Sequence, residues 1–89
     1  MQPPEYLLHG TGDVHVPSID EQGLKPGGRM YVHLTGDMEM AVAVGARHGK
    51  PVVYRVNAGA MNRDGCVFYH SASGVWLTDR VPKEYLEKL

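Results

Sequence analysis

The chain has 89 residues, with nine Lys and Arg against ten Asp and Glu, and its formal net charge is −1. That length suits a single domain, placed at residues 1–89. The near-neutral charge excludes a broad basic surface that neutralises many phosphates at once, so any contact with nucleic acid must be local. The lone Cys66 cannot close an intramolecular disulfide, and no apolar run is long enough for a signal or a membrane span, so we expect a cytoplasmic protein.

Short apolar segments interrupted by glycine and proline predict brief strands and small helices. A first strand is expected at Tyr6–Leu8, followed by a polar, glycine-bearing loop at residues 9–13. A short helix is expected at Ser18–Gln22, because a proline suits its first turn and Gly23 suits the left-handed position after its last turn. Residues 25–28, with one proline and two glycines, predict a turn.

The next predicted strand, Arg29–Leu34, alternates side chains of different character. Its apolar face, which should pack into the core, carries Met30, Val32 and Leu34. Its other face looks at solvent or at a ligand cleft and carries Arg29, Tyr31 and His33.

A helix should follow this strand, with Thr35 or Asp37 as its N-terminal cap. Its apolar stripe consists of Met38, Ala41, Val42 and Gly45. Gly49 and Pro51 should end it.

In the C-terminal half, the strand with the clearest β-branched pattern is Pro51–Val56. One helical turn is expected around Met61, and two further strands at Val67–Tyr69 and Gly74–Thr78. One more turn is expected at residues 82–89. Together these elements predict a compact α+β domain with a small twisted sheet.

The candidate chemistry lies in five histidines, but no pair has the spacing of a zinc site, so no metal is expected; they are His9, His15, His33, His48 and His70. His15 reads as a solvated loop residue, and His48 is explained by its place at a helix C-terminus. The triplet His9–Thr11 stands at the end of a strand, where Gly10 lets a ligand approach the backbone. The alternative is a plain turn with a surface histidine.

Four segments read together are more specific: His-Gly-Thr, Gly-Leu-Lys-Pro-x-x-Arg-x-Tyr-Val-His-Leu, Arg-His-Gly-Lys-Pro-Val-Val and Gly-Val-Trp-Leu-Thr-Asp-x-Val-Pro. They occupy His9–Thr11, Gly23–Leu34, Arg47–Val53 and Gly74–Pro82. In this order they resemble the C-terminal, ADP-ribosyltransferase lobe of the bacterial tRNA 2′-phosphotransferase family. The resemblance extends from about Pro3 to Leu86.

The resemblance implies an ADP-ribosyltransferase-like fold, with two packed short β-sheets and short helices around an NAD cleft. His9 would hydrogen-bond an NAD ribose, the backbone of Gly10 would hold the nicotinamide carboxamide, and Thr11 would lie beside it. His33 would line the nicotinamide-riboside pocket. Val75 would take the place of the catalytic glutamate of toxin-like relatives, so no general-base carboxylate is expected there.

The resemblance also identifies Arg29 as the essential arginine of this lobe, catalytic together with His33. In the family, a 2′-phosphate of RNA attacks the ribose carbon that bears nicotinamide, and the ribose 2″-hydroxyl then attacks that phosphorus. The products are RNA with a free 2′-hydroxyl, ADP-ribose 1″,2″-cyclic phosphate and nicotinamide. An ionised phosphate needs positioning more than deprotonation, and the arginine fork suits that task. A structural salt bridge is the alternative for Arg29.

Several residues keep two interpretations. Ser71 and Ser73 are candidate hydroxyl donors to NAD or simple turn residues before Gly74. Tyr31 and Tyr69 could stack on adenine or nicotinamide or cover the sheet. Trp76 is expected in the core, with base stacking as the alternative.

Family members carry an N-terminal winged-helix-like lobe that adds an Arg-His pair and another arginine to the 2′-phosphate. The chain starts where that lobe would end, so full activity is expected to need it as a partner. Three hypotheses remain: a lobe of an NAD-dependent RNA 2′-phosphotransferase, a free-standing ADP-ribosyltransferase acting on another phosphate acceptor or a protein, and a module that binds NAD or ADP-ribose without chemistry. Expected partners are NAD and 2′-phosphorylated RNA, with no membrane.

Overall fold

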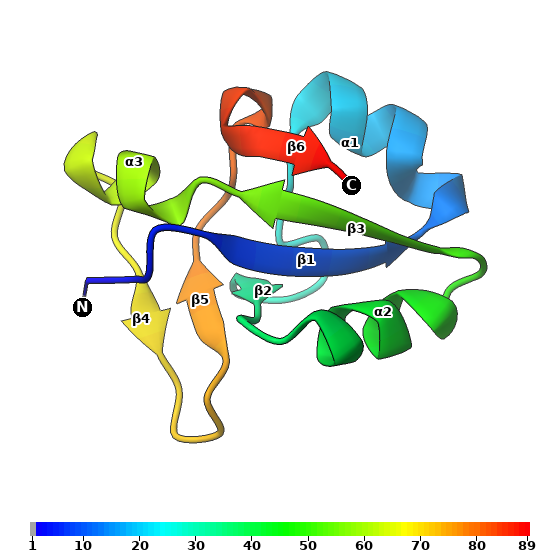
Figure 1. Ribbon diagram of the computed structural model, residues 1–89. Coiled ribbons are helices and arrows are strands. Elements are labelled where there is room, and N and C mark those ends of the chain that lie inside the picture. The colour runs from blue at the N-terminus through cyan, green and yellow to red at the C-terminus, as the bar shows by residue number, and fades with distance from the viewer. Residues whose placement is uncertain (1) are drawn as a thin grey trace.

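The computed structural model describes residues 2–89, which form short strands and helices in an α+β arrangement (Figure 1). In chain order the elements are β1 (Leu7–Gly12), the 3-10 turn η1 (Asp13–His15), α1 (Val16–Gln22), β2 (Val32–Leu34), α2 (Met38–Ala46), β3 (Pro51–Val56), α3 (Ala58–Arg63), β4 (Tyr69–His70), β5 (Trp76–Thr78), the 3-10 turn η2 (Lys83–Tyr85) and β6 (Leu86–Lys88).

The strands form two small antiparallel sheets, with the orders β1-β3-β6 and β2-β5-β4. Within residues 2–89 a single bridge joins the sheets: the Leu8 N–H donates to the Thr35 carbonyl at 2.7 Å, and the Thr35 N–H donates to the Leu8 carbonyl at 2.9 Å. Beyond this bridge, β1 and β2 do not pair with each other in the described residues. β1 pairs with β3, and β2 pairs with β5. The two sheets therefore open from one another along the edge of β1.

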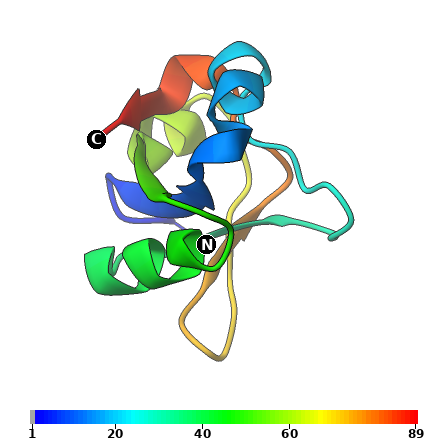
Figure 2. The ribbon, with the colours of Figure 1, turned by 90° about the vertical axis from the view of Figure 1, so that its right-hand side faces the viewer.

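The core is a cluster of buried side chains that includes Leu7, Leu34, Tyr54, Met61 and Phe68, each 0 or 1% exposed. In both ribbon views α1 and α2 lie on opposite sides of the β1–β3 pair (Figures 1 and 2). The core therefore fixes β1 from one side while α2 packs on the other.

Gly10 in β1 and Gly45 in α2 allow this strand and this helix to pack closely. A Cβ atom on Gly10 would overlap the backbone carbonyl of Ala41, and one on Gly45 would lie 2.7 Å from the carbonyl oxygen of Thr11. The predicted break between a strand at Tyr6–Leu8 and a loop at residues 9–13 was therefore wrong, because β1 continues to Gly12. The glycines there indicate a close approach between backbones, which a strand tolerates, and no turn.

The predicted strand Arg29–Leu34 is shorter than expected, because only Val32–Leu34 is a strand. β5 ends opposite Val32, at Thr78, so the residues before Val32 have no strand to pair with. Met30 was placed in the core and is instead 83% exposed. Val32 and Leu34 are buried as predicted.

The helix expected after this strand is confirmed as α2, and Asp37 rather than Thr35 caps it by accepting the N–H groups of Glu39 and Met40. Two members of its predicted apolar stripe, Met38 and Val42, are 46% and 40% exposed. The helix packs through its small residues, Ala41 and Gly45, so the larger apolar side chains beside them stay outside the contact.

Other predicted elements agree in type and differ at their ends. The helix before Gly23 is α1, which starts two residues earlier than predicted, and Gly23 has the expected positive φ of 76°. β3 has the predicted bounds, and the expected strands near Val67–Tyr69 and Gly74–Thr78 appear as the shorter β4 and β5. The tail was predicted as a helical turn. It forms η2 and then β6, which pairs with β3.

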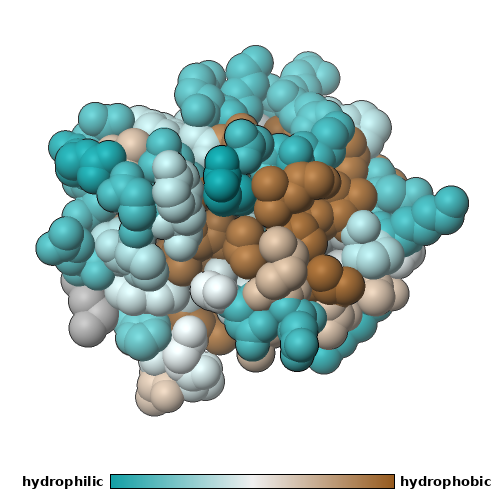
Figure 3. Space-filling view, viewed as in Figure 1, coloured by the Kyte–Doolittle hydropathy of each residue, from teal (hydrophilic) through white to brown (hydrophobic). Residues whose placement is uncertain are grey.

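Seen as in Figure 1, the molecular surface carries a group of apolar residues over β1, β3 and the facing part of α2, surrounded by polar side chains (Figure 3). Of the helices in residues 2–89, none has the length and apolar character needed to cross a bilayer.

Candidate functional site

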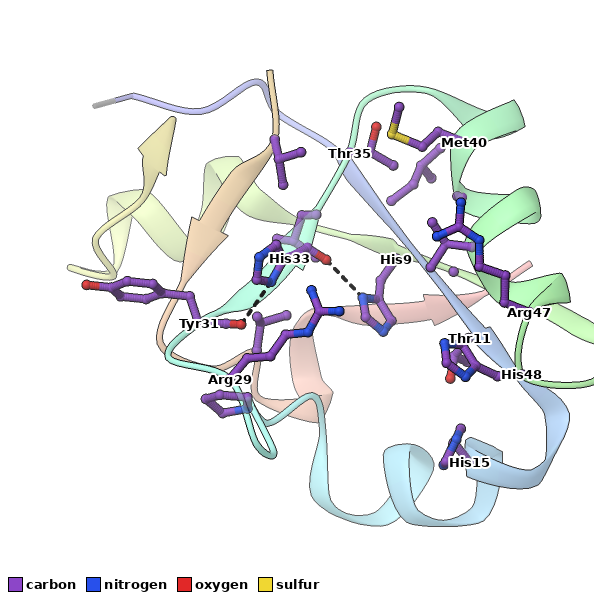
Figure 4. A pocket seen from close by; sticks show the side chains of 18 of the residues that line it. His9, Thr11, His15, Arg29, Tyr31, His33, Thr35, Met40, Arg47 and His48 are labelled. Atoms are coloured by element: carbon purple, nitrogen blue, oxygen red, sulfur yellow. Dashed lines mark hydrogen bonds between the residues drawn. The ribbon is translucent and has the colours of Figure 1, made fainter. Parts of the chain in front are cut away.

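A cavity of about 420 Å³ follows the edge of β1 where β2 separates from it (Figure 4). β1 and β2 form two walls, α2 forms a third, and the segment before β2 closes one end. The residues that line it are Leu8, His9, Gly10, Thr11, His15, Lys25, Pro26, Arg29, Tyr31, Val32, His33, Leu34, Thr35, Met40, Ala41, Val44, Arg47, His48 and Val75.

His9 and His33 meet at the point where the two strands part. Continuing the Leu8–Thr35 bridge as an antiparallel ladder would pair Gly10 with His33. The His33 carbonyl oxygen instead lies 3.1 Å from Nδ1 of His9. Backbone groups alternate in direction along a strand, so the N–H and C=O of Gly10 face the same edge as those of Leu8. They point into the cavity, away from β3.

The hydrogen bond to His33 fixes the proton of His9. A carbonyl oxygen only accepts, so Nδ1 of His9 carries the hydrogen and the neutral ring keeps Nε2 as an acceptor. Burial lowers the pKa of His9, an effect that the bond to the His33 carbonyl opposes and the nearby His33 ring reinforces. At neutral pH His9 therefore offers one acceptor nitrogen to a ligand hydroxyl.

His33 is oriented in a similar way, because its Nδ1 lies 3.1 Å from the carbonyl oxygen of Tyr31. When neutral, this ring also keeps Nε2 as an acceptor. Two histidines from distant parts of the chain thus hold their Nδ1 atoms on backbone carbonyls, as Figure 4 shows.

The cavity concentrates positive charge although the whole chain has a net charge of −1. Its charged lining consists of Lys25, Arg29 and Arg47, and no described Asp or Glu contributes to it. An anionic ligand would be attracted to such a cleft. Among residues 2–89, no three or more His, Cys, Asp or Glu side chains are grouped so that they could hold a metal ion.

Arg29 extends from the segment before β2 toward His9 and His33 (Figure 4). Within residues 2–89 no carboxylate forms an ion pair with it, so the predicted alternative of a structural salt bridge finds no support. Tyr31 and His33 line the same cavity. The three residues predicted to share a strand face thus lie together, although only His33 belongs to a strand.

A second group of cationic or titratable residues, which was not predicted from the sequence, lies at the opposite end of the cavity. Arg47 and His48 follow the last turn of α2, and His15 ends η1. The rings of His15 and His48 lie edge to face, with 6.4 Å between their centroids. Nothing in the local pattern shows that these two segments meet. The motif Arg-His-Gly-Lys-Pro, which contributes to the family resemblance, was the available signal, but His48 within it was interpreted only as a residue at a helix C-terminus.

The remaining predicted site residues have different positions. Thr11 and Val75 line the cavity, and Thr11 is 6% exposed. Ser71 and Ser73 lie in the β4–β5 turn, outside the lining, with their hydroxyl oxygens 3.0 Å apart. Because the Ser71 hydroxyl accepts the Val75 N–H at 3.1 Å, this pair positions the residue that does reach the cavity.

Comparison with known proteins identifies the family of this chain. The family described as RNA 2'-phosphotransferase, Tpt1 / KptA family, matches residues 1–80. A probable RNA 2'-phosphotransferase of Nostoc punctiforme is 55% identical over 87 residues, which are 98% of this chain and 48% of that protein. A protein of the same description from Acaryochloris marina is 52% identical, over 96% of this chain and 47% of that protein. Another, from Streptomyces coelicolor, is 55% identical, over 94% of this chain and 46% of that protein.

The chain thus spans about half the length of the curated relatives it matches. The match nevertheless covers nearly all of the chain, including every residue that lines the cavity. The predicted resemblance is therefore confirmed, and the chain belongs to the RNA 2'-phosphotransferase, Tpt1 / KptA family.

Proposed function

We propose that this chain is the NAD-binding lobe of an RNA 2′-phosphotransferase and that it has an ADP-ribosyltransferase-like fold. The whole protein would transfer an RNA 2′-phosphate to NAD, giving ADP-ribose 1″,2″-cyclic phosphate and nicotinamide. One observation carries the proposal: a neutral His9, the open backbone edge of Gly10 and Arg29 converge on a single cationic cavity.

The donor set of the cavity fits NAD. The Gly10 N–H can donate to the oxygen of a carboxamide while its C=O accepts from the amide nitrogen, because both groups face the opening between the strands. Nε2 of His9 can accept a hydrogen from a ribose hydroxyl. Arg47, at the other end, suits the pyrophosphate. Thr11 and Val75 would complete the wall beside the nicotinamide.

Arg29 and His33 are proposed as the catalytic residues. NAD supplies a ribose carbon whose bond to nicotinamide can be displaced. Arg29 would hold the RNA 2′-phosphate in a bidentate contact and offset its charge as it reacts. Nε2 of His33 would accept the hydrogen of a ribose hydroxyl at the same end of the cavity. Val75 lies in the lining, so the phosphate, already ionised, acts without a carboxylate base at that position.

The half of the relatives' length that this chain does not match is proposed to form an N-terminal lobe that adds further phosphate contacts. Each charge-assisted contact contributes roughly 1.5–3 kcal/mol, so three such contacts together decide whether transfer is measurable. We therefore expect these 89 residues, assayed without that lobe, to bind NAD and to transfer phosphate weakly or not at all.

The test is to incubate the purified chain with NAD and a 2′-phosphorylated RNA oligonucleotide, with and without a separately expressed N-terminal lobe of a relative. Products are separated by mass, and NAD binding is measured by calorimetry. The proposal expects NAD binding by the chain and ADP-ribose 1″,2″-cyclic phosphate once the lobe is added. ADP-ribose attached to a protein or to a phosphate end would favour a free-standing transferase, and NAD binding without any product would favour a binding module.

A further inference from the structure

The sheet β2-β5-β4 continues the wall of the cavity outward. His33, Leu77 and Tyr69 are direct partners across its three strands, in the pairs His33–Leu77 and Leu77–Tyr69. Directly opposed residues of a pleated sheet project from the same face. The face that carries His33 toward the cavity therefore extends through Leu77 to Tyr69.

Tyr31 joins this face to the cavity. Its ring centroid lies 5.4 Å from that of Tyr69, with the rings tilted by 53°. Tyr31 is half-buried and lines the cavity, whereas Tyr69 is 46% exposed. Tyr31, Leu77 and Tyr69, which we call the tyrosine shelf, thus form a partly exposed aromatic surface beside the end of the cavity that holds Arg29.

Two features of this position indicate what the shelf binds. Aromatic side chains next to a cationic group are a common arrangement for single-stranded nucleic acid, because bases stack on the rings while the cation holds the phosphate. The cations suited to the pyrophosphate of NAD, Arg47 with His48 and His15 nearby, lie at the opposite end (Figure 4). A ligand on the shelf would therefore reach Arg29 from the end of the cavity that lies opposite the cations suited to the pyrophosphate.

We infer that the tyrosine shelf stacks an RNA base next to the 2′-phosphate held by Arg29. This inference rests on the proposed function, because it assigns the RNA, and not the adenine of NAD, to this end of the cavity. Stacking accepts every base, since each has a π face. The shelf would thus position the acceptor strand without reading its sequence.

The experiment uses the 89-residue chain and a fluorescent RNA hexanucleotide with one internal 2′-phosphate. Three further RNAs each lack one base, at the phosphate-bearing nucleotide or at either neighbour. The dissociation constants are measured by anisotropy for the wild type, Tyr69→Ala, Tyr69→Phe and Tyr6→Ala. Tyr6, which is 50% exposed and lies over Arg55, is the matched control.

For the wild type, removing one base should weaken binding about 5- to 10-fold, the lower range for a base stacked on an aromatic ring. Tyr69→Ala should weaken binding of the intact RNA by the same factor. Its affinity should not fall further for the RNA whose missing base weakened binding to the wild type. Tyr69→Phe and Tyr6→Ala should bind like the wild type. This pattern would show that Tyr69 acts through the base.

Three results would overturn the inference that the tyrosine shelf stacks an RNA base. These are equal binding of all four RNAs by the wild type, no measurable binding of the intact RNA, or an equal loss of affinity in Tyr69→Ala for the RNA with the stacked base and for the RNA without it. Calorimetry with NAD on the same samples separates this outcome from a failure of the proposed function. A wild type that binds no NAD contradicts the proposed function. A Tyr69→Ala variant that loses NAD affinity and keeps RNA affinity contradicts the assignment of the shelf to RNA.

Discussion

Nδ1 of His9 lies 3.1 Å from the carbonyl oxygen of His33, where the next backbone hydrogen bond of an antiparallel ladder would otherwise form. This side chain has two effects. It satisfies a carbonyl that the separation of β1 from β2 would leave without a strand partner, and it keeps the edge of Gly10 open. One hydrogen bond thus links the packing of the two sheets to the shape of the site.

The first prediction concerns the protonation of His9. Burial lowers its pKa below the ordinary value of about 6.5. Between the two values the unfolded chain binds more protons than the folded one, so stability from the neutral ring is present above pH 6.5 and falls as the pH drops through the lowered pKa. NAD affinity should fall over the same range, because protonation removes the acceptor at Nε2.

Two measurements check this prediction. The His9 ring should titrate below pH 6.5 by NMR, and calorimetry should show the NAD dissociation constant rising in step with that titration. His9→Phe keeps a ring and should remove this pH dependence. Unchanged NAD affinity through the titration of His9 would exclude its proposed role as an acceptor.

The second prediction concerns Gly10. Replacing it with alanine would place a methyl group against the backbone carbonyl of Ala41, and a carbonyl within a helix cannot swing aside as a side chain would. We expect Gly10→Ala to lower the free energy of unfolding in urea by about 3 kcal/mol or more, the upper range for overpacking. Gly36→Ala is the control, because no described atom lies within 4 Å of its added Cβ. Similar stability for both variants would contradict the close packing of α2 on β1.

The third prediction separates binding from transfer at Arg29. In an assay that includes the second lobe, Arg29→Ala should reduce phosphate transfer at least about 100-fold, a typical loss on removing one group that stabilises developing charge. NAD affinity should change less than about twofold. Arg29→Lys keeps the charge but loses the bidentate fork, so it should recover only part of the rate. Equal losses in NAD affinity and transfer would place Arg29 in the NAD pocket instead.

Local sequence patterns predicted those parts of the fold that local physics decides. β3 is rich in β-branched residues, and Gly23 has the positive φ that follows a helix end. The errors arise where long-range contacts decide. β1 passes through two glycines because α2 packs there, and β6 exists because β3 offers it an edge.

The site shows the same division. The family resemblance singled out His9 and His33, which line one cavity in the structure, and alternation independently grouped His33 with Arg29 and Tyr31. The contribution of His15 could not be predicted, because it depends on where η1 meets the end of α2. A histidine that lies in a polar segment carries no local sign of a partner far along the chain.

The fourth prediction concerns the buried Tyr54, whose hydroxyl donates to Oδ1 of Asp20 at 2.7 Å while Nζ of Lys88 donates to Oδ2 at 3.0 Å. These bonds join α1 to β3 and β6. The hydrogen bond from Tyr54, followed by that from Lys88, lowers the pKa of Asp20 below its ordinary value of 3.8. Stability from the ionised carboxylate is therefore present above about pH 4 and is lost as the pH falls through the lowered pKa.

Tyr54→Phe removes the larger of the two contributions that lower the pKa of Asp20, while it keeps the ring in the core. We expect it to lower the melting temperature at pH 7 by about 5 °C, and the difference from the wild type should shrink as the pH falls below 4 and Asp20 becomes protonated. Asp20→Asn keeps an oxygen that can accept from Tyr54 but cannot titrate there, so its melting temperature should depend less on acid. A difference between Tyr54→Phe and the wild type that stays constant from pH 7 to pH 2.5 would show that the hydroxyl stabilises the fold independently of the charge on Asp20.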